Sequence, residues 1–529
     1  MEAILKCIKR LLSQISQRLA NHTNSLGLDD KINEAFMPIA QAFEDLVFTE
    51  IHLGFHSIPI ILIVLILGAT FFTLYFGFIN FRKIPLSIQI VRGKYDHLES
   101  SIPHEDIPHT IKNESIVGEV NHFQALATAV SGTVGLGNIA MVAVAISIGG
   151  PGATFWMIIA GLLGMSSKFV ECTLGVKYRE SNKGTVYGGP MYYLSKGLAE
   201  KGYKHLGKFL ASMFAILCVG ASFGGGNAFQ SNQAAAQIIS RFDLQGPASG
   251  TIIGILIALI AGIVIIGGIR RIAKFTEKIV PLMAIIYVIA CLFILIMHFK
   301  LIGEAFLLIF SEAFNPRPAI AGGFIGAMIQ GFRRAAFSNE AGAGSAAIAH
   351  SAVKTNYPVS EGLVALLEPM IDTVFICTLT ALVIIIFNME GAFEYGDVID
   401  NQILLTTSGE RIGGVNLTSL AFDYSLPGFS YVLVIAVVLF ALSTLISWSY
   451  YGLQAWVYLF GKGTKIEMTY KLIFLIFTIL GAAVTMDAVI KFSEAMILAL
   501  VFPNMIGLFL LFPKVKEELH TYLNKIKKV

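Results

Sequence analysis

The chain has 529 residues, of which 55% are hydrophobic and only 14% are charged, and its formal net charge is +3. Soluble globular proteins carry about 25% charged residues, so this composition excludes an ordinary soluble enzyme, a disordered scaffold and a nucleic-acid-binding protein. Repeated long apolar runs predict instead an all-α polytopic membrane protein that lies in a lipid bilayer.

The apolar runs recur along most of the chain. A spanning helix needs about 20 largely apolar residues, and about eleven segments meet that requirement. Residues 1–56 precede them and mix charged residues with Leu and Ile, which is typical of a surface helix or a loose tail. The first span, 57–80, is expected to be peripheral, and a basic tail follows at 513–529. The other spans are predicted near 121–148, 152–176, 207–239, 248–268, 278–299, 318–350, 363–388, 429–459, 469–487 and 489–512.

Lys and Arg sort the connections between spans into two sides. About 25 basic residues fall on one side and about 10 on the other. Because cytoplasmic loops carry the excess, the pattern predicts an outer N-terminus and a cytoplasmic C-terminus, which requires an odd number of spans. The longest outer connection, 389–428, is polar. The location expected is a bacterial or archaeal-type cytoplasmic membrane.

Two spans contain residues that interrupt a helix. The second span holds three glycines within 131–138, and the seventh mixes Gly with polar and charged residues within 330–345. Each helical Gly costs about 1 kcal/mol relative to Ala. Exposed backbone at membrane depth is tolerated only against protein or a water-filled cavity. Both segments are therefore predicted to be locally unwound, with glycine packing between helices as the alternative.

The positions of the two breaks suggest a repeat. One break opens a group of five spans, 121–299, and the other opens the next group of five, 300–512. With five spans in each group, the second group must run with opposite topology. Matched interrupted helices in two such halves are typical of an inverted-repeat secondary transporter.

Unwound backbone supplies its own binding chemistry. Freed N–H groups at a half-helix N-terminus favour a carboxylate. Freed carbonyls and hydroxyls bind a hard cation such as sodium. An amino-acid zwitterion together with a sodium ion suits such a break.

At these residues the sequence resembles the alanine or glycine:cation symporter family. The resemblance covers about residues 57–512, the range of the predicted membrane spans. The family resemblance implies sodium-coupled transport of small neutral amino acids by alternating access, with no enzymatic activity and no cofactor beyond sodium as coupling ion. It also implies a leucine-transporter-type five-plus-five inverted repeat with one extra N-terminal helix. The stretches that carry the resemblance are His122–Leu126, Thr133–Asn138, Gly149–Ala153, Gly188–Tyr193, Phe337–Ser345 and Ser443–Gly452.

The resemblance also implies binding residues at the first break. Backbone groups near Gly135, Leu136 and Gly137 would hold the substrate carboxylate. Thr133 and Asn138 align with one sodium site of more distant relatives. The other sodium site would combine the carbonyls of Ser131 and Val134 with the hydroxyls of Ser443 and Thr444. The alternative for those two hydroxyls is a hydrogen bond to their own helix.

Further site residues are expected on two other helices. Asn227 and Gln230 are three residues apart and share a helix face; in the family this face points at the substrate, and Gln230 would accept from the ammonium group. The alternative is a helix–helix hydrogen bond. Gln330, Gly331 and Phe332 are expected at the second break, where Phe332 or a neighbour would limit side-chain size.

Charged residues inside spans are costly, so each invites a functional hypothesis beside a structural pairing. Lys168 is expected to pair with Glu171, three residues along the helix. Glu340 is expected to pair with Arg333 or Arg334 and to brace or gate the broken helix. Asp372, which would face the cytosolic path or a sodium ion, and Asp487 are the other acidic residues.

Three other functions compete with sodium-driven symport. Protons could replace sodium in a carrier of the same fold, although no isolated membrane carboxylate is an obvious proton carrier. A membrane-embedded enzyme would need clustered His, Asp or Glu, and the eleven histidines are scattered. A channel would show a filter repeat or a charged pore ring, and neither is evident.

Overall fold

The computed structural model describes residues 28–527, apart from 54–55, 97, 99–117, 183, 245, 247 and 318–319. The part of the predicted tail before residue 28 therefore lies outside the described residues. The rest of the tail forms helix α2 (Leu28–Val47), and a short hairpin of β1 (Glu50–Leu53) and β2 (His56–Pro59) leads into the bundle.

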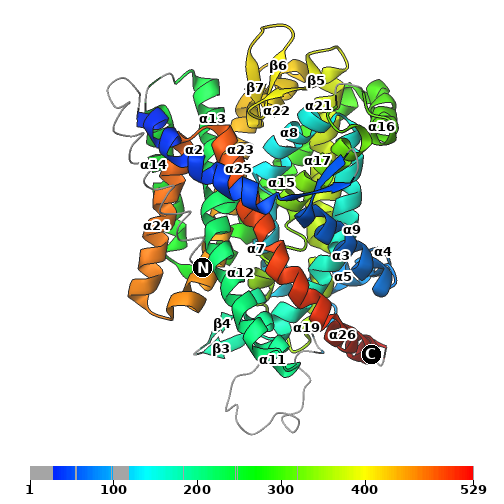
Figure 1. The fold of residues 1–529 in the computed structure, drawn as a ribbon, viewed down its shortest axis with the longest axis vertical. Coiled ribbons are helices and arrows are strands. Elements are labelled where there is room, and N and C mark those ends of the chain that lie inside the picture. The colour runs from blue at the N-terminus through cyan, green and yellow to red at the C-terminus, as the bar shows by residue number, and fades with distance from the viewer. Residues whose placement is uncertain are drawn as a thin grey trace.

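The helices follow the predicted spans in order (Figure 1). The peripheral segment comprises α3 (Ile60–Tyr75), α4 (Ile79–Arg82) and α5 (Ile84–Val91). The next part of the bundle comprises α7 (His122–Thr133), η2 (Leu136–Asn138), α8 (Ala140–Gly149), α9 (Gly152–Lys177), α10 (Pro190–Tyr192), η3 (Tyr193–Gly197), α11 (Leu198–Glu200), α12 (Lys204–Phe223), η4 (Gly224–Ala228), α13 (Phe229–Phe242), α14 (Ser249–Ile265) and α15 (Gly268–Met297).

The second part of the bundle follows α15 and α16 (Phe299–Phe314) and contains five predicted spans, as the first part does. It comprises α17 (Gly323–Asn339), α18 (Ala346–His350), α19 (Pro358–Ala365), α20 (Leu367–Pro369), η5 (Met370–Cys377), α21 (Thr378–Asn388), α23 (Ser430–Phe460), α24 (Thr464–Ala483), α25 (Met486–Ala499) and α26 (Val501–Ile526).

The protein is a mostly helical polytopic membrane protein, as the composition predicts. Within the described residues, seven helical stretches are long and apolar enough to cross a bilayer. The bent pair formed by α7 and by Leu136–Gly149 raises that number to eight, with an angle of 54° between its halves. The shorter apolar helices α3 and α14 fall below this length limit. The eleven predicted segments all contain helix, and the number that crosses stays a prediction.

Several elements outside the spans were not expected from the sequence. Helix α16 (Phe299–Phe314) lies between the two groups of spans. The polar connection 389–428 folds into a small sheet covered by α22 (Val415–Ser425), and together they cap one end of the bundle (Figure 1). The sheet has the order β5-β6-β7, built from β5 (Phe393–Ile399), β6 (Gln402–Leu405) and β7 (Arg411–Gly413), and a separate hairpin pairs β3 (Glu180–Asn182) with β4 (Thr185–Tyr187).

Helix α2 lies across the bundle and packs along α25 (Figure 1). The rings of Phe36 and Phe43 both meet the edge or face of Phe492, with centroids 5.2 and 5.8 Å away. Asn33 Oδ1 accepts from the hydroxyl of Thr485 at 2.8 Å, and Lys491 donates to the side chain of Gln41 at 2.9 Å. The amphipathic segment is thus attached to one helix by both aromatic and polar contacts.

We predict that Phe492→Ala lowers the apparent melting temperature of the purified protein, because it removes the buried ring that both α2 aromatics contact. Truncating a buried Phe costs about 3 kcal/mol or more. The matched control is Phe299→Ala, since that ring is 65% exposed. Thermal unfolding of both variants in detergent checks this, and equal melting temperatures would contradict the attachment of α2.

Candidate functional site

The first break redirects the backbone of two residues. Helix α7 ends at Thr133, and Gly135 has extended backbone angles of φ −135° and ψ −152°. In a continuous helix the N–H groups of residues 135 and 136 would bind the carbonyls of Ser131 and Gly132. Instead Gly135 donates to Asn138 Oδ1 at 2.9 Å and Leu136 donates to Gln230 Oε1 at 3.0 Å. The carbonyls of Ser131 and Gly132 therefore lose their helical donors.

Gly135 is at the tightest point of the break. A Cβ on this residue would lie 2.3 Å from Thr444 Oγ1, which is too short for a side chain, and 3.1 Å from Gln230 Oε1, which is a tight contact. A Cβ on Gly137 would have its nearest neighbour, the Cα of Ser338, at 3.6 Å, which is ordinary contact. Glycine is thus required for close packing at 135 but not at 137.

Gln230 is held so that its oxygen faces the break. Its amide nitrogen donates to the carbonyl of Gly225 at 2.9 Å, which fixes the orientation of the side chain. The π-helical turn η4 lies immediately before Gln230, and such turns are frequent at functional sites. The turn is pressed against α23, because a Cβ on Gly226 would lie 2.2 Å from Trp448 Cγ. Packing of η4 therefore sets the position of this amide.

Asn138 connects the same break to the π-helix η5. Its side-chain nitrogen donates to Asp372 Oδ1 at 2.7 Å, while its backbone carbonyl accepts from the Thr380 hydroxyl at 2.8 Å. Ser338 and Thr373 donate to the other oxygen of Asp372 at 2.9 and 2.6 Å. Asp372 is fully buried. Both oxygens of this carboxylate thus accept hydrogen bonds from neutral side chains.

Hydroxyl groups around the break fall into two kinds. Thr444 Oγ1 is buried beside Gly135 and has no hydrogen-bond partner among the described residues. Ser443 donates its hydroxyl to its own helix at the Phe440 carbonyl, 2.9 Å away, and its carbonyl accepts from the Ser131 hydroxyl at 2.8 Å. The Thr133 hydroxyl also bonds back to its helix, at the Ala129 carbonyl, 3.3 Å away. Among these hydroxyls, Thr444 is the one that makes no hydrogen bond to the described residues.

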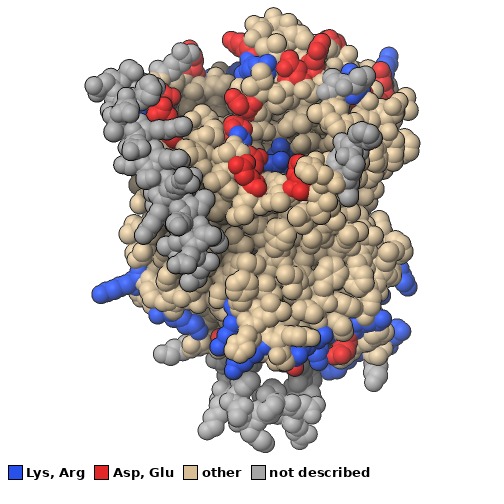
Figure 2. Space-filling view, in the orientation of Figure 1, with Lys and Arg blue, Asp and Glu red and all other residues tan. Residues whose placement is uncertain are grey.

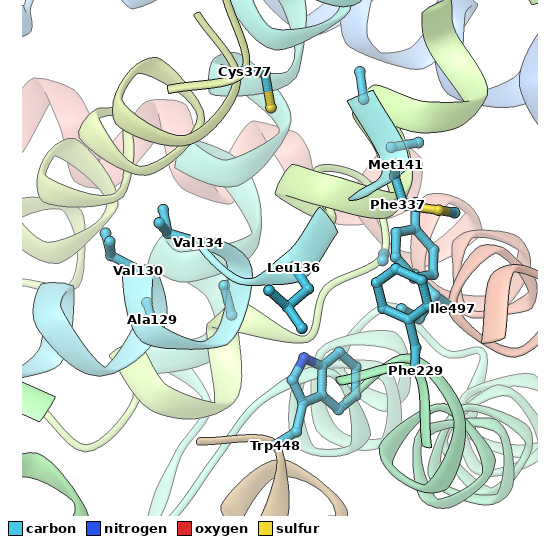
Figure 3. Packing of buried hydrophobic residues seen from close by; sticks show 14 of the residues in the cluster. Ala129, Val130, Val134, Leu136, Met141, Phe229, Phe337, Cys377, Trp448 and Ile497 are labelled. Atoms are coloured by element: carbon cyan, nitrogen blue, oxygen red, sulfur yellow. The ribbon is translucent and has the colours of Figure 1, made fainter. Parts of the chain in front are cut away.

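Apolar side chains close the space beside the break. Figure 3 shows Leu136 pointing toward the ring of Trp448, with Phe229 and Phe337 grouped on another side. The Phe229 and Phe337 rings meet edge to face with centroids 5.2 Å apart. The Trp448 indole donates to Glu340 Oε1 at 3.0 Å, so its ring is held in place. These side chains surround the freed backbone with apolar groups.

The second break begins later than expected. Helix α17 continues to Asn339, and the chain turns at Glu340, which has a left-handed φ of 54°. The expectation that Gln330, Gly331 and Phe332 lie at this break is therefore wrong. A Cβ on Gly331 would lie 2.5 Å from Trp156 Cβ, so this glycine serves helix packing against α9. The aromatic residue that α17 brings to the first break is Phe337.

Asn227 does not accompany Gln230 at the break. Its amide donates to the Phe474 carbonyl of α24 at 2.5 Å, which is the helix–helix hydrogen bond of the alternative interpretation. The π-helical turn ends at Ala228, between the two residues, so regular helical spacing does not apply there. The sequence pattern alone gave no sign of this turn.

Most of the buried charges pair with residues distant in sequence. Lys168 donates to Glu368 at 3.0 Å, whereas Glu171 accepts from the Asn504 amide at 3.1 Å. Arg333 and Arg334 both pair with Glu494 of α25, so their expected pairing with Glu340 is wrong. The other acidic residue of the spans, Asp487, pairs with Lys491 at 2.9 Å.

The oxygen donors at the first break suit a hard monovalent cation. Among the described residues there is no group of three or more His, Cys, Asp or Glu side chains arranged to hold a metal ion. The break offers instead backbone carbonyls at Ser131 and Gly132 together with the Thr444 hydroxyl. Neutral oxygen ligands of this kind bind hard cations.

Comparison with known proteins identifies a family and several similar proteins. The model of the sodium:alanine symporter family matches residues 42–529. The chain is 37% identical over 473 residues to the sodium/alanine symporter AgcS of Methanococcus maripaludis, covering 89% of this chain and 95% of that protein. It is 36% identical over 411 residues to the putative sodium/proton-dependent alanine carrier protein YrbD of Bacillus subtilis, covering 77% and 82%. Among solved structures, MhsT in complex with L-phenylalanine is similar at 16% identity and a TM-score of 0.48, covering 75% of this chain and 99% of that chain.

We predict that Gly135→Ala removes the stabilisation of the purified protein by sodium. A ligand that binds only the folded state raises the melting temperature by mass action. The added methyl would occupy the space between Thr444 and Gln230, while overpacking itself costs about 1–3 kcal/mol. Gly137→Ala is the control, and it should keep the sodium-dependent rise. A Gly135→Ala protein that melts higher with sodium, as the wild type does, would remove the break from the cation site.

Proposed function

We propose that this chain, which belongs to the sodium:alanine symporter family, carries alanine, glycine or a similarly small neutral amino acid into the cell. The protein is a sodium-coupled amino-acid symporter of the membrane. The observation that carries the choice of site is the pair of backbone N–H groups at Gly135 and Leu136. These groups donate to side-chain amide oxygens instead of to helical carbonyls. An enzymatic activity is not part of this proposal.

The substrate carboxylate is proposed to take over the N–H groups of the first break. A carboxylate is a stronger acceptor than an amide oxygen, so it displaces Asn138 and Gln230 from Gly135 and Leu136. The Gln230 oxygen then becomes free to accept from the substrate ammonium group. Leu136, with the Trp448 and Phe337 rings, limits the side chain to the size of alanine (Figure 3). Gly137 lines the same turn.

The coupling ion is proposed to bind on the other side of the unwound turn. The carbonyls of Ser131 and Val134 with the hydroxyls of Ser443 and Thr444 form the main sodium site. The Thr444 hydroxyl, which has no hydrogen-bond partner among the described residues, supports this assignment, and the Ser443 hydroxyl can donate to the Phe440 carbonyl while its oxygen binds the ion. A second sodium position is proposed at Thr133 and Asn138.

The driving force is sufficient for accumulation. A neutral zwitterion moving with one sodium ion carries one net charge, and a potential of about 100 mV supplies roughly 2.3 kcal/mol. A tenfold sodium gradient adds about 1.4 kcal/mol. Together they support roughly several hundred-fold accumulation. Proton coupling in the same fold is the alternative, and it would not need the neutral oxygen donors described above.

The orientation is proposed from the distribution of charge. Figure 2 shows Lys and Arg gathered along the lower rim of the visible face, at the end where Figure 1 places α19 and α26. By the positive-inside rule this end faces the cytoplasm, with the C-terminus inside and the sheet-capped end outside. The two inverted repeats are proposed to be 121–299 and 300–512, with the broken helix as the first span of each.

We predict sodium-driven uptake of labelled alanine by the protein in proteoliposomes. An inward sodium gradient should accelerate uptake, and a potassium gradient of the same size should not, because the neutral-oxygen site selects the smaller ion by fit. Competition by unlabelled glycine should be strong and competition by leucine weak. Uptake that ignores the sodium gradient would reject sodium symport by this site.

We predict that Thr444→Val raises the sodium concentration for half-maximal alanine uptake by about tenfold, which corresponds to about 1.4 kcal/mol of lost cation binding. Valine keeps the shape of threonine and removes the hydroxyl. Thr154→Val is a matched control, since that hydroxyl is also buried and without a hydrogen-bond partner, but it lies on α9 away from the break. An unchanged sodium requirement in Thr444→Val would exclude this hydroxyl as a ligand.

A further inference from the structure

A row of buried titratable side chains runs from one end of the bundle toward the second break. His122 at the start of α7 and His350 at the end of α18 both contact the Glu361 carboxylate, with His350 Nδ1 2.5 Å from Glu361 Oε1. The other ring nitrogen of His350 lies 3.6 Å from Glu368 Oε2. The second oxygen of Glu368 accepts from Lys168 at 3.0 Å.

The row ends near the second break. Glu171 and Glu340 lie close enough to Lys168 to act on its charge. The two oxygens of Glu340 are held by the Trp448 indole and the Ser345 hydroxyl. Members of the row are almost inaccessible to solvent, and the most exposed of the seven is His122, at 8%. Contact with water is therefore made at the His122 end.

The charges of the row do not balance without extra protons. One ammonium, on Lys168, faces four carboxyl groups, so neutral imidazoles would leave three uncompensated negative charges. Protonating both imidazoles still leaves one. An unpaired buried charge costs several kcal/mol, so the row retains protons when it is closed. How many it retains depends on the pH of the water that reaches it.

Two atoms in the row are placed to share a proton. His350 Nε2 and Glu368 Oε2 face one another, and both are buried without a hydrogen-bond partner among the described residues. A proton on the nitrogen gives an imidazolium beside a carboxylate. The same proton on the oxygen gives a neutral imidazole beside a carboxylic acid. Either state is neutral overall, whereas loss of the proton leaves a buried negative charge.

The buried titratable groups that face the row from neighbouring elements are weak acids, whereas the basic Arg179 lies at its exposed end. Among the described residues these acids include Tyr451 of α23, Cys172 of α9, Cys218 of α12, Tyr193 of η3 and Asp372 of η5. None of these five supplies a positive charge. Asp372 contacts Asn138, which belongs to the proposed sodium region, and it is not assigned to the proton site.

The exposed end of the row is closed by a basic residue and a loop. Arg179 donates to the carbonyls of Ser351 and Thr355 at 2.8 and 2.7 Å, directly after α18. The backbone of Glu119 donates to the Ala352 carbonyl at 2.7 Å, which joins the start of α7 to the same loop. Water reaches His350 only when α7 and the loop after α18 separate.

We propose that His122, Glu361, His350 and Glu368 form a proton-binding site that exchanges with the cytoplasmic side when that end of the carrier opens. The site goes beyond sodium-coupled symport, although its sidedness rests on the orientation proposed above. Because the row ends at Glu340, the proton enters and leaves on one side and is not carried across. The bound proton holds α18, α19 and α20 together through opposite charges. Losing it leaves one further uncompensated negative charge buried in the row, so a higher cytoplasmic pH favours opening.

The test uses right-side-out membrane vesicles, whose lumen and bath are buffered separately at a fixed sodium gradient. Initial uptake of labelled alanine should rise about tenfold as the lumen pH is raised from about 7 to about 10, a window above the ordinary range of histidine because the buried carboxylates beside His350 stabilise its protonated ring. The same change in the bath should leave the rate unaltered. His350→Gln keeps a polar side chain of similar size and cannot be protonated, so its rate should no longer respond to lumen pH.

His298→Gln is the matched control, because His298 lies at the opposite end of the bundle beside Tyr424, with ring centroids 6.4 Å apart. It should keep the wild-type response.

A wild-type rate that does not change with lumen pH, or that follows bath pH equally, would overturn the proposal. If His350→Gln fails to fold, the response of wild-type uptake to lumen pH still tests the proposal. In addition, His122→Gln should weaken that response. Sodium-dependent uptake with a flat lumen profile would remove the proton site only, whereas sodium-independent uptake would refute the proposed symport.

Discussion

The structure depends on how one interrupted helix satisfies its backbone away from water. At membrane depth an unpaired N–H or carbonyl group costs several kcal/mol, so a break survives only where protein supplies partners. Here the side chains of Asn138 and Gln230 accept from two freed N–H groups. A side-chain acceptor can give way to a ligand without unfolding a helix. The break is therefore both stable when empty and able to bind.

The surrounding elements serve to hold those two amides. The π-helical turn η4 fixes Gln230 through the Gly225 carbonyl, and η5 supplies the Asp372 carboxylate that orients Asn138. Close packing of α23 against both the break and η4 explains why Gly135 and Gly226 have no room for a side chain. A movement of α23 would thus be felt at the backbone groups and at the Thr444 hydroxyl together, which provides a physical basis for coupling ion and substrate.

Much of this arrangement follows from the sequence, and the remainder depends on packing. Glycines and polar residues inside an apolar run predict the first break, because their cost in a lipid-embedded helix is local. The position of the second break does not follow, since Gly331 is accommodated by Trp156 of another helix. Partners of Lys168 and Arg333 lie far along the chain, so nearest-neighbour spacing misplaces them. The departure of Asn227 reflects a π-helical turn that shifts the helix face.

The central claim is that ion and amino acid bind to two sides of the same unwound turn and stabilise one another. The most direct test is calorimetric titration of the purified protein with alanine at several sodium concentrations, and with sodium at several alanine concentrations. Thermodynamic linkage requires that each ligand lower the dissociation constant of the other by the same factor, here about tenfold or more. An alanine dissociation constant that is equal in sodium and in potassium would contradict the account.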